Sequence, residues 1–397
     1  MRVAHIITRM IVGGAQENTL FNCRDLIEIH GDDVLLVTGP SLGPEGDLLQ
    51  QGRGGGDKFN SVPVHEIPSL CRAIHPLRDQ ASYFAIKRVL KKLAPDVVHT
   101  HSAKAGVLGR LAAWSLKIPA IVHTVHGAPF YPYQPWLTRT FYRACEQLAA
   151  ARCHALISVA DAMTDQLVAA GVAPREKFTT IYSGMDVKPF LHSDEQRGAM
   201  RAQLGFSNQD IVIGKIARLF DLKGHDDVIA AATKVIAANR NVKFLFIGDG
   251  ILRPQLEAQI AAANLKRHFV FTGLVPPATI PHYIGAMDLL VHASLREGLA
   301  RALPQALIAG KPVVSYDIDG AREVTLADRT GFLLPPRDIA GLAQALITLA
   351  GDASLRQRLG KTGQRLFADQ FCHQSMTRQI RELYWRVIMR HASDHPM

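Results

Sequence analysis

Two cations in the second half of the chain have a spacing that suits a diphosphate. Arg218 and Lys223 lie five residues apart, after an apolar run typical of a strand and before a run typical of a helix. In open α/β sheets, ligands bind in the crevice at the carboxyl ends of strands, where both side chains are expected to point. Taken alone, the pattern is also typical of two solvated cations.

A glutamate and a glycine follow a later strand of the same half. After Glu297 and Gly298, a helical pattern reaches Gly310, and the free N–H groups at its start are expected to face the same crevice. Gln305 lies eight residues after Glu297, about two helical turns, so the two side chains share a face only if the helix begins early. A loop glutamate and a surface glutamine are the alternative.

A glycine turn follows the first expected strand. Gly13 and Gly14 precede a helix, whose backbone amides and dipole can receive a phosphate or a sugar. A tight turn between strand and helix requires the same glycines, and this alternative stays open. The segment is not a dinucleotide fingerprint, because G-x-G-x-x-G is absent and no acid ends the second strand, at Val37–Gly39.

The elements that must position these residues alternate along the whole chain. Short apolar runs of strand length are separated by segments of helical length, which predicts βαβ units, parallel sheets and the α/β class. The expected strands of the first half are Val3–Thr8, Asp33–Gly39, Asp96–His101, Ala120–His126, Ala155–Ala160 and Phe178–Ser183. Those of the second half are Ile211–Leu219, Val242–Gly248, Phe269–Gly273, Leu289–Ala293, Pro312–Tyr316 and Gly331–Leu334.

The length of 397 residues favours two domains. The polar stretch Asp186–Arg201 interrupts the strand pattern and is expected to link a domain at 1–188 to one at 189–373. Apolar residues at i, i+3, i+4 and i+7 predict an amphipathic helix over Gln374–Arg390. The low-complexity patch Gln51–Asp57 predicts a mobile loop.

Composition excludes several classes of protein. The chain is 48% apolar, which excludes disorder, and its net charge of +10 divides evenly between the halves, which argues against a nucleic-acid partner. Five scattered cysteines without a C-x-x-C pair, and seventeen histidines without metal-ligand spacing, indicate a reducing cytoplasm and no metal site. No signal peptide and no membrane-spanning apolar run are expected.

A basic helix face is expected over Gln80–Leu93. Lys87, Arg88, Lys91 and Lys92 occupy one side of this segment, and apolar residues occupy the other. Such a face can adhere to an anionic membrane surface at about 1 kcal/mol per cation. An ordinary solvated surface is the alternative.

From Met1 to about Tyr384, the order of these pieces resembles the family 4 glycosyltransferases of GT-B fold. The resemblance is close to the subgroup that builds bacterial capsule and exopolysaccharide. The motifs that carry the resemblance are Gly13-Gly14, Asp96–Gly106, His123–Gly127, Ser183–Asp186, Arg218 with Lys223-Gly224, Gly248–Gly250 and Arg296–Gly298. The resemblance implies two Rossmann-like domains facing a central cleft. It also implies that the helix within 374–397 crosses back onto the first domain.

The resemblance assigns roles to the matching residues. In such enzymes the residues that match Arg218 and Lys223 hold the donor diphosphate, the acid that matches Glu297 binds the transferred sugar, and the histidine that matches His126 lies across the cleft near the sugar. These four are the expected catalytic residues. Further donor contacts are expected from Gly13, Gly14, Gly248, Asp249, Gly250, Gly298, Leu299, Ala300 and Gln305.

Gln305 departs from the family pattern, which has a second glutamate at this place, commonly assigned to the ribose hydroxyls. A carboxylate accepts both hydroxyl protons, whereas an amide has one acceptor oxygen. The exchange is worth roughly 1 kcal/mol, so a several-fold lower donor affinity is expected, without loss of activity.

The implied activity is that of a retaining hexosyltransferase. It moves a sugar from a nucleoside-diphosphate sugar, with a UDP-sugar favoured, to a glycan or a polyprenyl-diphosphate-linked saccharide at the inner face of the membrane. Lys104, Gly106 and Arg110 are expected to meet an acceptor phosphate, with a loop of solvated cations as the alternative. No cofactor and no essential metal are expected, because two fixed cations can stabilise the leaving diphosphate.

Two other functions remain open at this point. A catalytically inactive sugar-nucleotide sensor is compatible with the loss of the usual glutamate at Gln305. A nicotinamide-dependent oxidoreductase would also show repeated βα units, but it requires the missing phosphate fingerprint.

Overall fold

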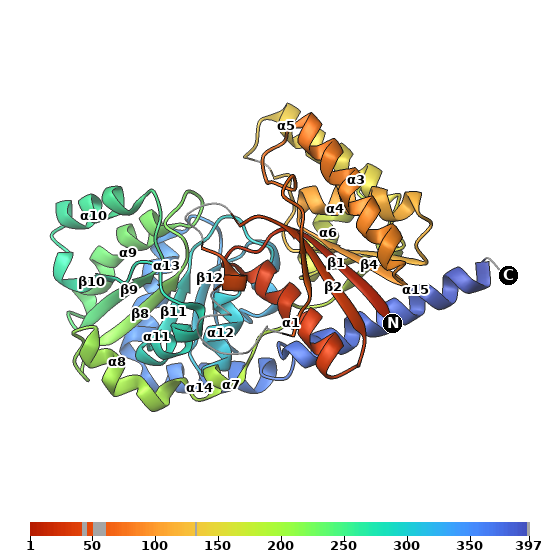
Figure 1. The fold of residues 1–397 in the computed structure, drawn as a ribbon. Helices are drawn as coiled ribbons and strands as arrows, with labels where there is room; N and C mark the ends of the chain where they lie inside the picture. Colours follow the sequence, from red (N-terminus) through yellow and green to blue (C-terminus); the bar gives the residue numbers. More distant parts are fainter. Residues whose placement is uncertain (42–45, 51–60, 132, 395–397) are drawn as a thin grey trace. The chain divides into compact units, whose positions relative to one another are not determined.

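The structure is a computed structural model that describes residues 1–41, 46–50, 61–131 and 133–394 (Figure 1). The chain divides into two compact units. Unit 1 comprises Met1–Met185 and Phe371–Met397, and unit 2 comprises Asp186–Gln370. These boundaries lie three residues before the expected ones at 188 and 373. The loop expected over Gln51–Asp57 lies outside the described residues.

Unit 1 is built on a seven-stranded parallel sheet in the order β3-β2-β1-β4-β5-β6-β7. Its strands are β1 Arg2–Arg9, β2 Asp33–Gly39, β3 Val64–Glu66, β4 Val97–His101, β5 Ala120–Val125, β6 Ala155–Ser158 and β7 Phe178–Thr180. Six of them coincide with expected strands. The edge strand β3 was not predicted, because three residues without a buried side chain leave no apolar run to recognise.

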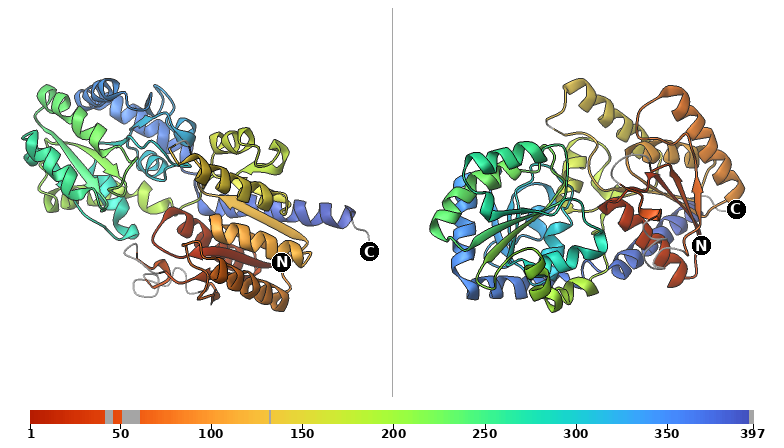
Figure 2. Two further views of the ribbon diagram at one scale, coloured as in Figure 1. Left: turned by 90° about the horizontal axis from the view of Figure 1, so that it is seen from above. Right: turned by 60° about the vertical axis from the view of Figure 1, so that its left-hand side comes forward.

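Helices cover both faces of this sheet (Figure 2). They are α1 Gly14–Glu28, α3 Pro76–Leu93, α4 Ala103–Ser115, α5 Trp136–Ala150, α6 Asp161–Ala169 and α15 His373–Asp394. The terminal helix α15 packs beside α1 and joins the core of unit 1 through Met376, Ile380 and Tyr384. Its Arg381 also pairs with the buried Asp32, with Nε 2.8 Å from Oδ2.

Unit 2 contains a six-stranded parallel sheet in the order β10-β9-β8-β11-β12-β13. Its strands are β8 Ile211–Ile216, β9 Val242–Ile247, β10 Phe269–Phe271, β11 Leu289–His292, β12 Val313–Tyr316 and β13 Gly331–Leu334. Its helices are α7 Lys188–Leu191, α8 Arg197–Gln203, α9 His225–Ala238, α10 Arg253–Ala262, α11 Ile280–Ala286, α12 Ala302–Ile308, α13 Ile339–Gly351 and α14 Ala353–Phe367. All six expected strands are present, which confirms the α/β class with two parallel sheets.

Each parallel sheet has one switch point, where two neighbouring strands are followed by chain segments that continue toward opposite sides of the sheet. In unit 1 this switch lies between β1 and β4, and in unit 2 it lies between β8 and β11. The helices that follow such a strand pair leave on opposite sides and open a crevice at the carboxyl ends of the strands, which is where open α/β sheets bind ligands.

Candidate functional site

The switch point of unit 2 brings a lysine and a glutamate together. Lys223 follows β8 and Glu297 follows β11, and Lys223 Nζ lies 2.5 Å from Glu297 Oε1. Their side chains are 18% and 22% exposed. A cation and an acid at this depth are shielded from bulk water yet open to a ligand, so either can exchange its partner for a substrate group.

Close backbone contact fixes the loop that carries Lys223. Gly224 has φ +63°, and a Cβ placed there would lie 1.9 Å from the carbonyl oxygen of Ala293. Leu295 N also donates to Leu222 O at 2.8 Å. Only glycine fits this left-handed position against the end of β11, and the contact sets the distance between Lys223 and the Glu297 loop.

The loop after β12 holds Glu297 in place. The backbone N–H of Glu297 donates to Asp319 Oδ2 at 2.7 Å, and that of Gly320 donates to Gly298 O at 2.9 Å. Burial raises the pKa of Asp319, against the hydrogen bond from Glu297 N, which lowers it. The sequence does not indicate a role for Asp319, because a single aspartate after a strand carries no pattern of its own.

Four further donor candidates, Arg218, Gly248, Asp249 and Gly250, lie on the adjacent loops after β8 and β9. Leu219 N donates to Asp249 O at 3.0 Å, which ties the two loops together. A Cβ at Gly248 would lie 2.2 Å from Ala217 O, and one at Gly250 would lie 2.7 Å from the Phe220 ring, so both positions require glycine. Arg218 stacks on the same Phe220 ring, with Cζ 5.1 Å from its centroid.

Three buried basic side chains lie in the same part of unit 2, and none was predicted. Lys215 is fully buried on β8, and burial, followed by the charge of Lys223, lowers its pKa to about 7. Burial also lowers the pKa of His225 to about 2 and that of His292 well below its usual value. Within the described ranges, Lys215 Nζ and both ring nitrogens of His225 have no hydrogen-bond partner.

Gln305 does not share a helical face with Glu297. Helix α12 begins at Ala302, five residues after Glu297, so Glu297 belongs to the loop before the helix. Gln305 is half-buried and is the fourth residue of α12. Leu299 and Ala300 lie in the turn between them. The sequence pattern did not show where the turn ends, and the early helix start that a shared face requires is absent from the structure.

In unit 1, the glycine turn is the start of α1 at the carboxyl end of β1. Gly13 caps the helix in an extended conformation, and Glu17 N donates to its carbonyl oxygen at 3.0 Å. The side chain of Gln16 folds over the turn, and its Nε2 donates to Arg9 O at 3.3 Å. Gly14 is the first residue of the helix.

His126 ends a row of histidines on one face of the sheet. A hydrogen bond of 3.1 Å joins His126 Nε2 to His101 Nδ1, and another of 3.0 Å joins His101 Nε2 to His5 Nδ1. Burial lowers the pKa of His5 to about 3 and that of His101 well below its usual value. His5 and His101 are therefore neutral, and each hydrogen bond of the row uses one ring proton.

His99 joins His5 and His101 in a cluster whose ring nitrogens lie within 4.8 Å of one another, a spacing that can hold a metal ion. The sequence showed no such spacing, because β1 and β4 meet only in the folded sheet. Both ring nitrogens of His99 form hydrogen bonds: Nδ1 lies 2.5 Å from the hydroxyl oxygen of Tyr384, and Nε2 lies 2.7 Å from Oγ1 of Thr124. The cluster is thus accounted for as a hydrogen-bonding network.

Two of the three acceptor candidates of unit 1, Gly106 and Arg110, are buried, and the third, Lys104, is paired with an acid. Arg110 is fully buried, and its Nη2 donates to Glu146 Oε2 at 2.8 Å, so the expectation that it meets an acceptor phosphate is wrong. A Cβ at Gly106 would lie 2.6 Å from the ring of His123. Lys104 is 11% exposed and pairs with Asp79 at 2.5 Å. Spacing placed Arg110 on the helix after β4 but did not show that it points inward.

Two family models match the chain and together span most of it. "Glycosyltransferase Family 4" matches residues 12–188, and "Glycosyl transferases group 1" matches residues 196–366. The first match ends at Lys188, where α7 begins, and the second begins at residue 196, after α7 has ended.

Curated relatives and solved structures agree with these matches. The chain is 28% identical over 359 residues to the UDP-Gal:alpha-D-GlcNAc-diphosphoundecaprenol alpha-1,3-galactosyltransferase of Escherichia coli, with 89% of each chain covered. It is 23% identical to the capsular polysaccharide biosynthesis glycosyltransferase CapM of Staphylococcus aureus, with 82% of this chain and 86% of CapM covered. The crystal structure of Anabaena HepE in complex with UDP and glucose has a TM-score of 0.81 at 23% identity, covering 96% of this chain and 99% of HepE.

Proposed function

The chain is a glycosyltransferase that belongs to family 4 and has the GT-B fold, and on this premise we propose that it transfers a hexose from a UDP-sugar to a lipid-linked saccharide. The E. coli relative transfers galactose from UDP-Gal to a GlcNAc residue that is linked to diphosphoundecaprenol. CapM acts in capsular polysaccharide synthesis. Both ends of the proposed reaction therefore have a counterpart among the relatives.

One observation carries the proposal. Lys223 and Glu297 meet at 2.5 Å at the switch point of unit 2, beside the loop that presents Arg218. When the bond between sugar and diphosphate breaks, negative charge grows on phosphate oxygens while the sugar becomes oxocarbenium-like. Arg218 and Lys223 are the cations for the phosphates, and Glu297 is the acceptor for a sugar hydroxyl.

A buried lysine on β8, Lys215, favours the same assignment. Lys215 has no hydrogen-bond partner among the described residues, and its pKa of about 7 leaves it partly protonated near neutral pH. An anion bound nearby favours its protonated form. Its charge adds to that of Lys223 and lowers the energy of a diphosphate bound above it. A site with this charge has no need of a divalent ion, so we propose that transfer is independent of metal.

For His126 we propose the role of a hydrogen-bond donor to the sugar in a reaction that retains the anomeric configuration. The Nε2 atom of His5 is buried without a partner in the described part of the chain. Burying an unpaired lone pair at this nitrogen costs less free energy than burying an unpaired N–H, so the proton of His5 is on Nδ1. His5 Nδ1 therefore donates to His101 Nε2, and His101 Nδ1 donates to His126 Nε2. The Nε2 of His126 then accepts, and its proton sits on Nδ1.

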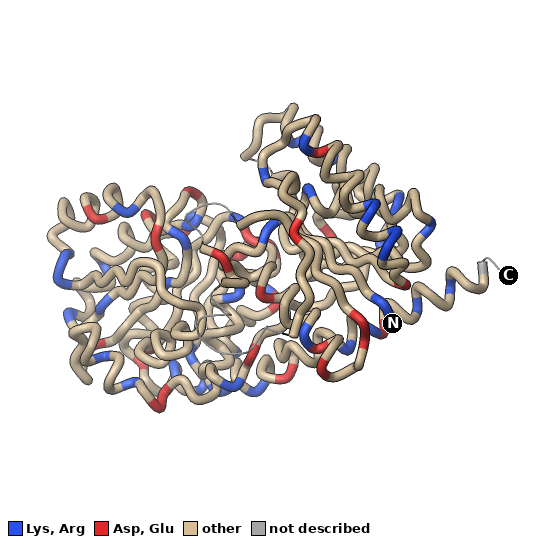
Figure 3. Tube along the Cα trace, in the orientation of Figure 1, with Lys and Arg blue, Asp and Glu red and all other residues tan. Residues whose placement is uncertain are grey.

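We also propose that unit 1 associates with the inner face of an anionic membrane. On α3, Arg88, Lys91 and Lys92 are exposed, and Figure 3 shows the row of cations along this helix. On α5, the first turns expose three large apolar side chains: Trp136 at 68%, Leu137 at 64% and Phe141 at 53%. Among the described residues, no helix combines the length and apolar character needed to cross a bilayer.

Donor binding tests the core of the proposal. Arg218→Ala with Lys223→Ala is expected to abolish transfer from a labelled UDP-hexose and to weaken UDP binding at least a hundredfold, because two charge-assisted contacts worth about 1.5–3 kcal/mol each are lost. Lys234→Ala, an exposed lysine on α9, is the matched control. If the double variant transfers at the wild-type rate, the proposal fails. Tight UDP binding by the wild type without transfer or hydrolysis would indicate a sensor.

Membrane association has its own test. Vesicles that contain phosphatidylglycerol are expected to sediment the wild type at low salt and to release it at high salt, because surface charges are screened. Trp136→Ser with Phe141→Ser should weaken sedimentation without changing UDP binding. Absence of wild-type binding to these vesicles at low salt would refute the membrane proposal while leaving the donor assignment intact.

A further inference from the structure

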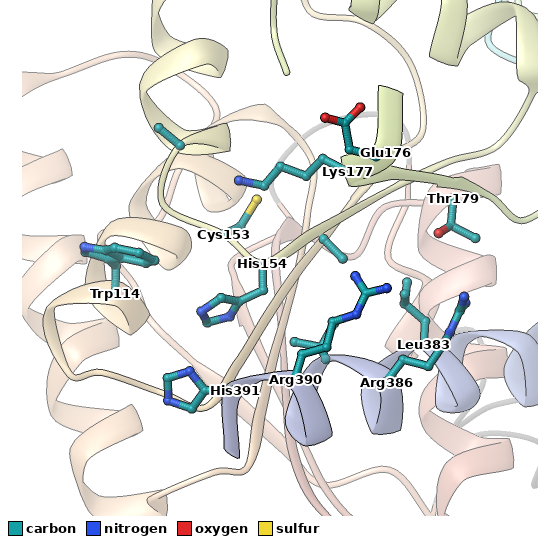
Figure 4. A pocket seen from close by; sticks show the side chains of 13 residues that line it. Trp114, Cys153, His154, Glu176, Lys177, Thr179, Leu383, Arg386, Arg390 and His391 are labelled. Carbon is teal, nitrogen blue, oxygen red and sulfur yellow. The ribbon is translucent and has the colours of Figure 1, made fainter. Parts of the chain in front are cut away.

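A cavity of about 410 Å³ lies in unit 1, away from the residues discussed so far. Its walls come from the end of α4, the residues that lead into β6 and β7, and the last turns of α15 (Figure 4). These are the amino ends of the strands. Gly13 and His126 follow the carboxyl ends of β1 and β5, so the cavity and these two candidate residues of unit 1 lie at opposite edges of one parallel sheet.

The charged side chains around this cavity are mostly cationic. Arg386 and Arg390 lie one helical turn apart on α15 and extend toward the segment that carries Lys177 and Thr179 (Figure 4). Both arginines are exposed, and neither has a hydrogen-bond or ion-pair partner within the described ranges. Glu176 is the one carboxylate among the lining residues. The cavity therefore has a net positive charge.

Two other polar groups of the cavity, on Lys177 and His154, are oriented as donors. Lys177 Nζ donates to Ala150 O at 2.7 Å, which orients its ammonium group and leaves two N–H bonds for a ligand. His154 Nδ1 accepts a hydrogen bond from Ile121 N at 2.9 Å, so the proton of the neutral ring is on Nε2. Burial, followed by the nearby His391 and Lys177, lowers the pKa of His154 to about 4, which keeps this ring neutral.

A row of rings forms one wall of the cavity. The indole of Trp114 is 46% exposed, and its centroid lies 5.9 Å from that of His154. The His154 ring lies 5.6 Å from that of His391. Buried Leu383 and Val387 of α15 complete the lining. The cavity thus offers an apolar surface beside its cations, and its volume is within the range of about 300–1,000 Å³ typical of sites for small organic ligands.

We propose that this cavity binds the phosphate group of an organic phosphate, with Arg386 and Arg390 as its anchors. Two arginines at i and i+4 repel each other in the absence of an anion, whereas a phosphate between them accepts hydrogen bonds from both guanidinium groups. Lys177 and His154 supply further donors from the opposite wall. A phosphorylated metabolite and a phospholipid headgroup share this chemistry.

Such a ligand would hold the last turns of α15 against the segments before β6 and β7. Segments of unit 1 that are far apart in sequence meet at this cavity. Helix α15 begins at His373, whereas β6 begins at Ala155. The bound phosphate is therefore expected to protect the amides of residues 386–393 from hydrogen exchange.

Inorganic pyrophosphate is the first probe. Its binding to the full chain is measured by calorimetry with saturating UDP present, so that the donor site is already filled. Arg386→Gln with Arg390→Gln is expected to weaken pyrophosphate binding at least tenfold. Arg378→Gln, which removes an exposed arginine of the same helix outside the cavity, is expected to leave it unchanged.

Vesicles of phosphatidylglycerol are the second probe and identify the source of the phosphate. If the double variant loses only pyrophosphate binding, a soluble phosphate is the ligand. If it loses only vesicle binding, the ligand is a lipid headgroup. The proposal is overturned if the wild type binds neither probe, or if the double variant and Arg378→Gln bind both probes alike. Equal far-ultraviolet circular dichroism of all variants excludes unfolding as the cause.

Discussion

Replacing Lys215 by methionine is expected to stabilise unit 2 near neutral pH. Lys215 lies on the central strand β8 with its side chain fully buried, and its Nζ has no hydrogen-bond partner in the described part of the structure. Burial is the main reason that its pKa falls from 10.5 to about 7. Methionine fills a similar space with an unbranched, uncharged side chain, so the substitution removes the charge without opening a large cavity.

The magnitude follows from the difference between the two pKa values. In the unfolded chain Lys215 holds its proton up to pH 10.5, whereas in the folded chain it loses the proton above about pH 7. Between these values the unfolded state binds more protons, so the free energy of unfolding rises with pH by up to about 1.4 kcal/mol per pH unit. The folded state therefore bears a cost of up to about 5 kcal/mol at pH 7, which disappears toward pH 10.5.

The assay compares urea unfolding of the wild type and Lys215→Met between pH 7 and pH 9.5. The stabilisation by methionine is expected to be largest at pH 7 and to shrink as pH rises, while the other titrating groups cancel in the difference. Lys234→Met, at an exposed position of α9, is the control and should shift stability by less than about 0.5 kcal/mol. Parallel stability curves for wild type and Lys215→Met over this range would refute the reasoning.

Four further outcomes are expected. Arg110→Met should cost about 3–5 kcal/mol of stability in urea unfolding, because it leaves Glu146 buried without a partner. Adding Glu146→Leu should recover most of this loss, and failure to do so would contradict a role limited to the ion pair. Gln305→Glu should tighten UDP binding several-fold in calorimetry, by roughly 1 kcal/mol; if it destroyed binding while Gln305→Ala did not, the ribose assignment would be wrong. His126→Asn should lower the transfer rate and change KM less than kcat, and a rate close to the wild type would remove His126 from the site. Transfer should survive EDTA, and a loss that Mg²⁺ or Mn²⁺ restores would show that a metal is essential.

The fold was predictable because it is encoded locally. Alternation of apolar runs with helical segments identified twelve strands, and the structure contains all of them with ends shifted by a few residues. The amphipathic pattern of Gln374–Arg390 likewise predicted α15, which extends from His373 to Asp394. The pattern failed at β3, where the strand is too short and too exposed to carry a hydrophobic signal.

The candidate site was predictable only in part. Motif spacing selected Lys223 and Glu297, which the structure brings to 2.5 Å from each other. Motif spacing did not select Asp319, which accepts a hydrogen bond from the backbone of Glu297. It also did not select Lys215, because a single lysine within an apolar strand gives no sign that it is buried near a ligand site. Motif spacing names residues at the ends of strands, whereas the groups that orient and charge a site come from neighbouring strands.

The sequence by itself determined the order of the elements, the parallel sheets and the membership in a family, since these depend on periodicity and on short motifs. The tertiary structure alone decided which side chains are buried and what they face. Arg110 was an acceptor candidate until it proved to be paired with Glu146, 36 residues away, and His5 met His101 across 96 residues. Solvation and charge pairing set the chemistry of an ionisable group, and both arise from contacts between segments whose separation along the chain bears no relation to their distance in the folded protein.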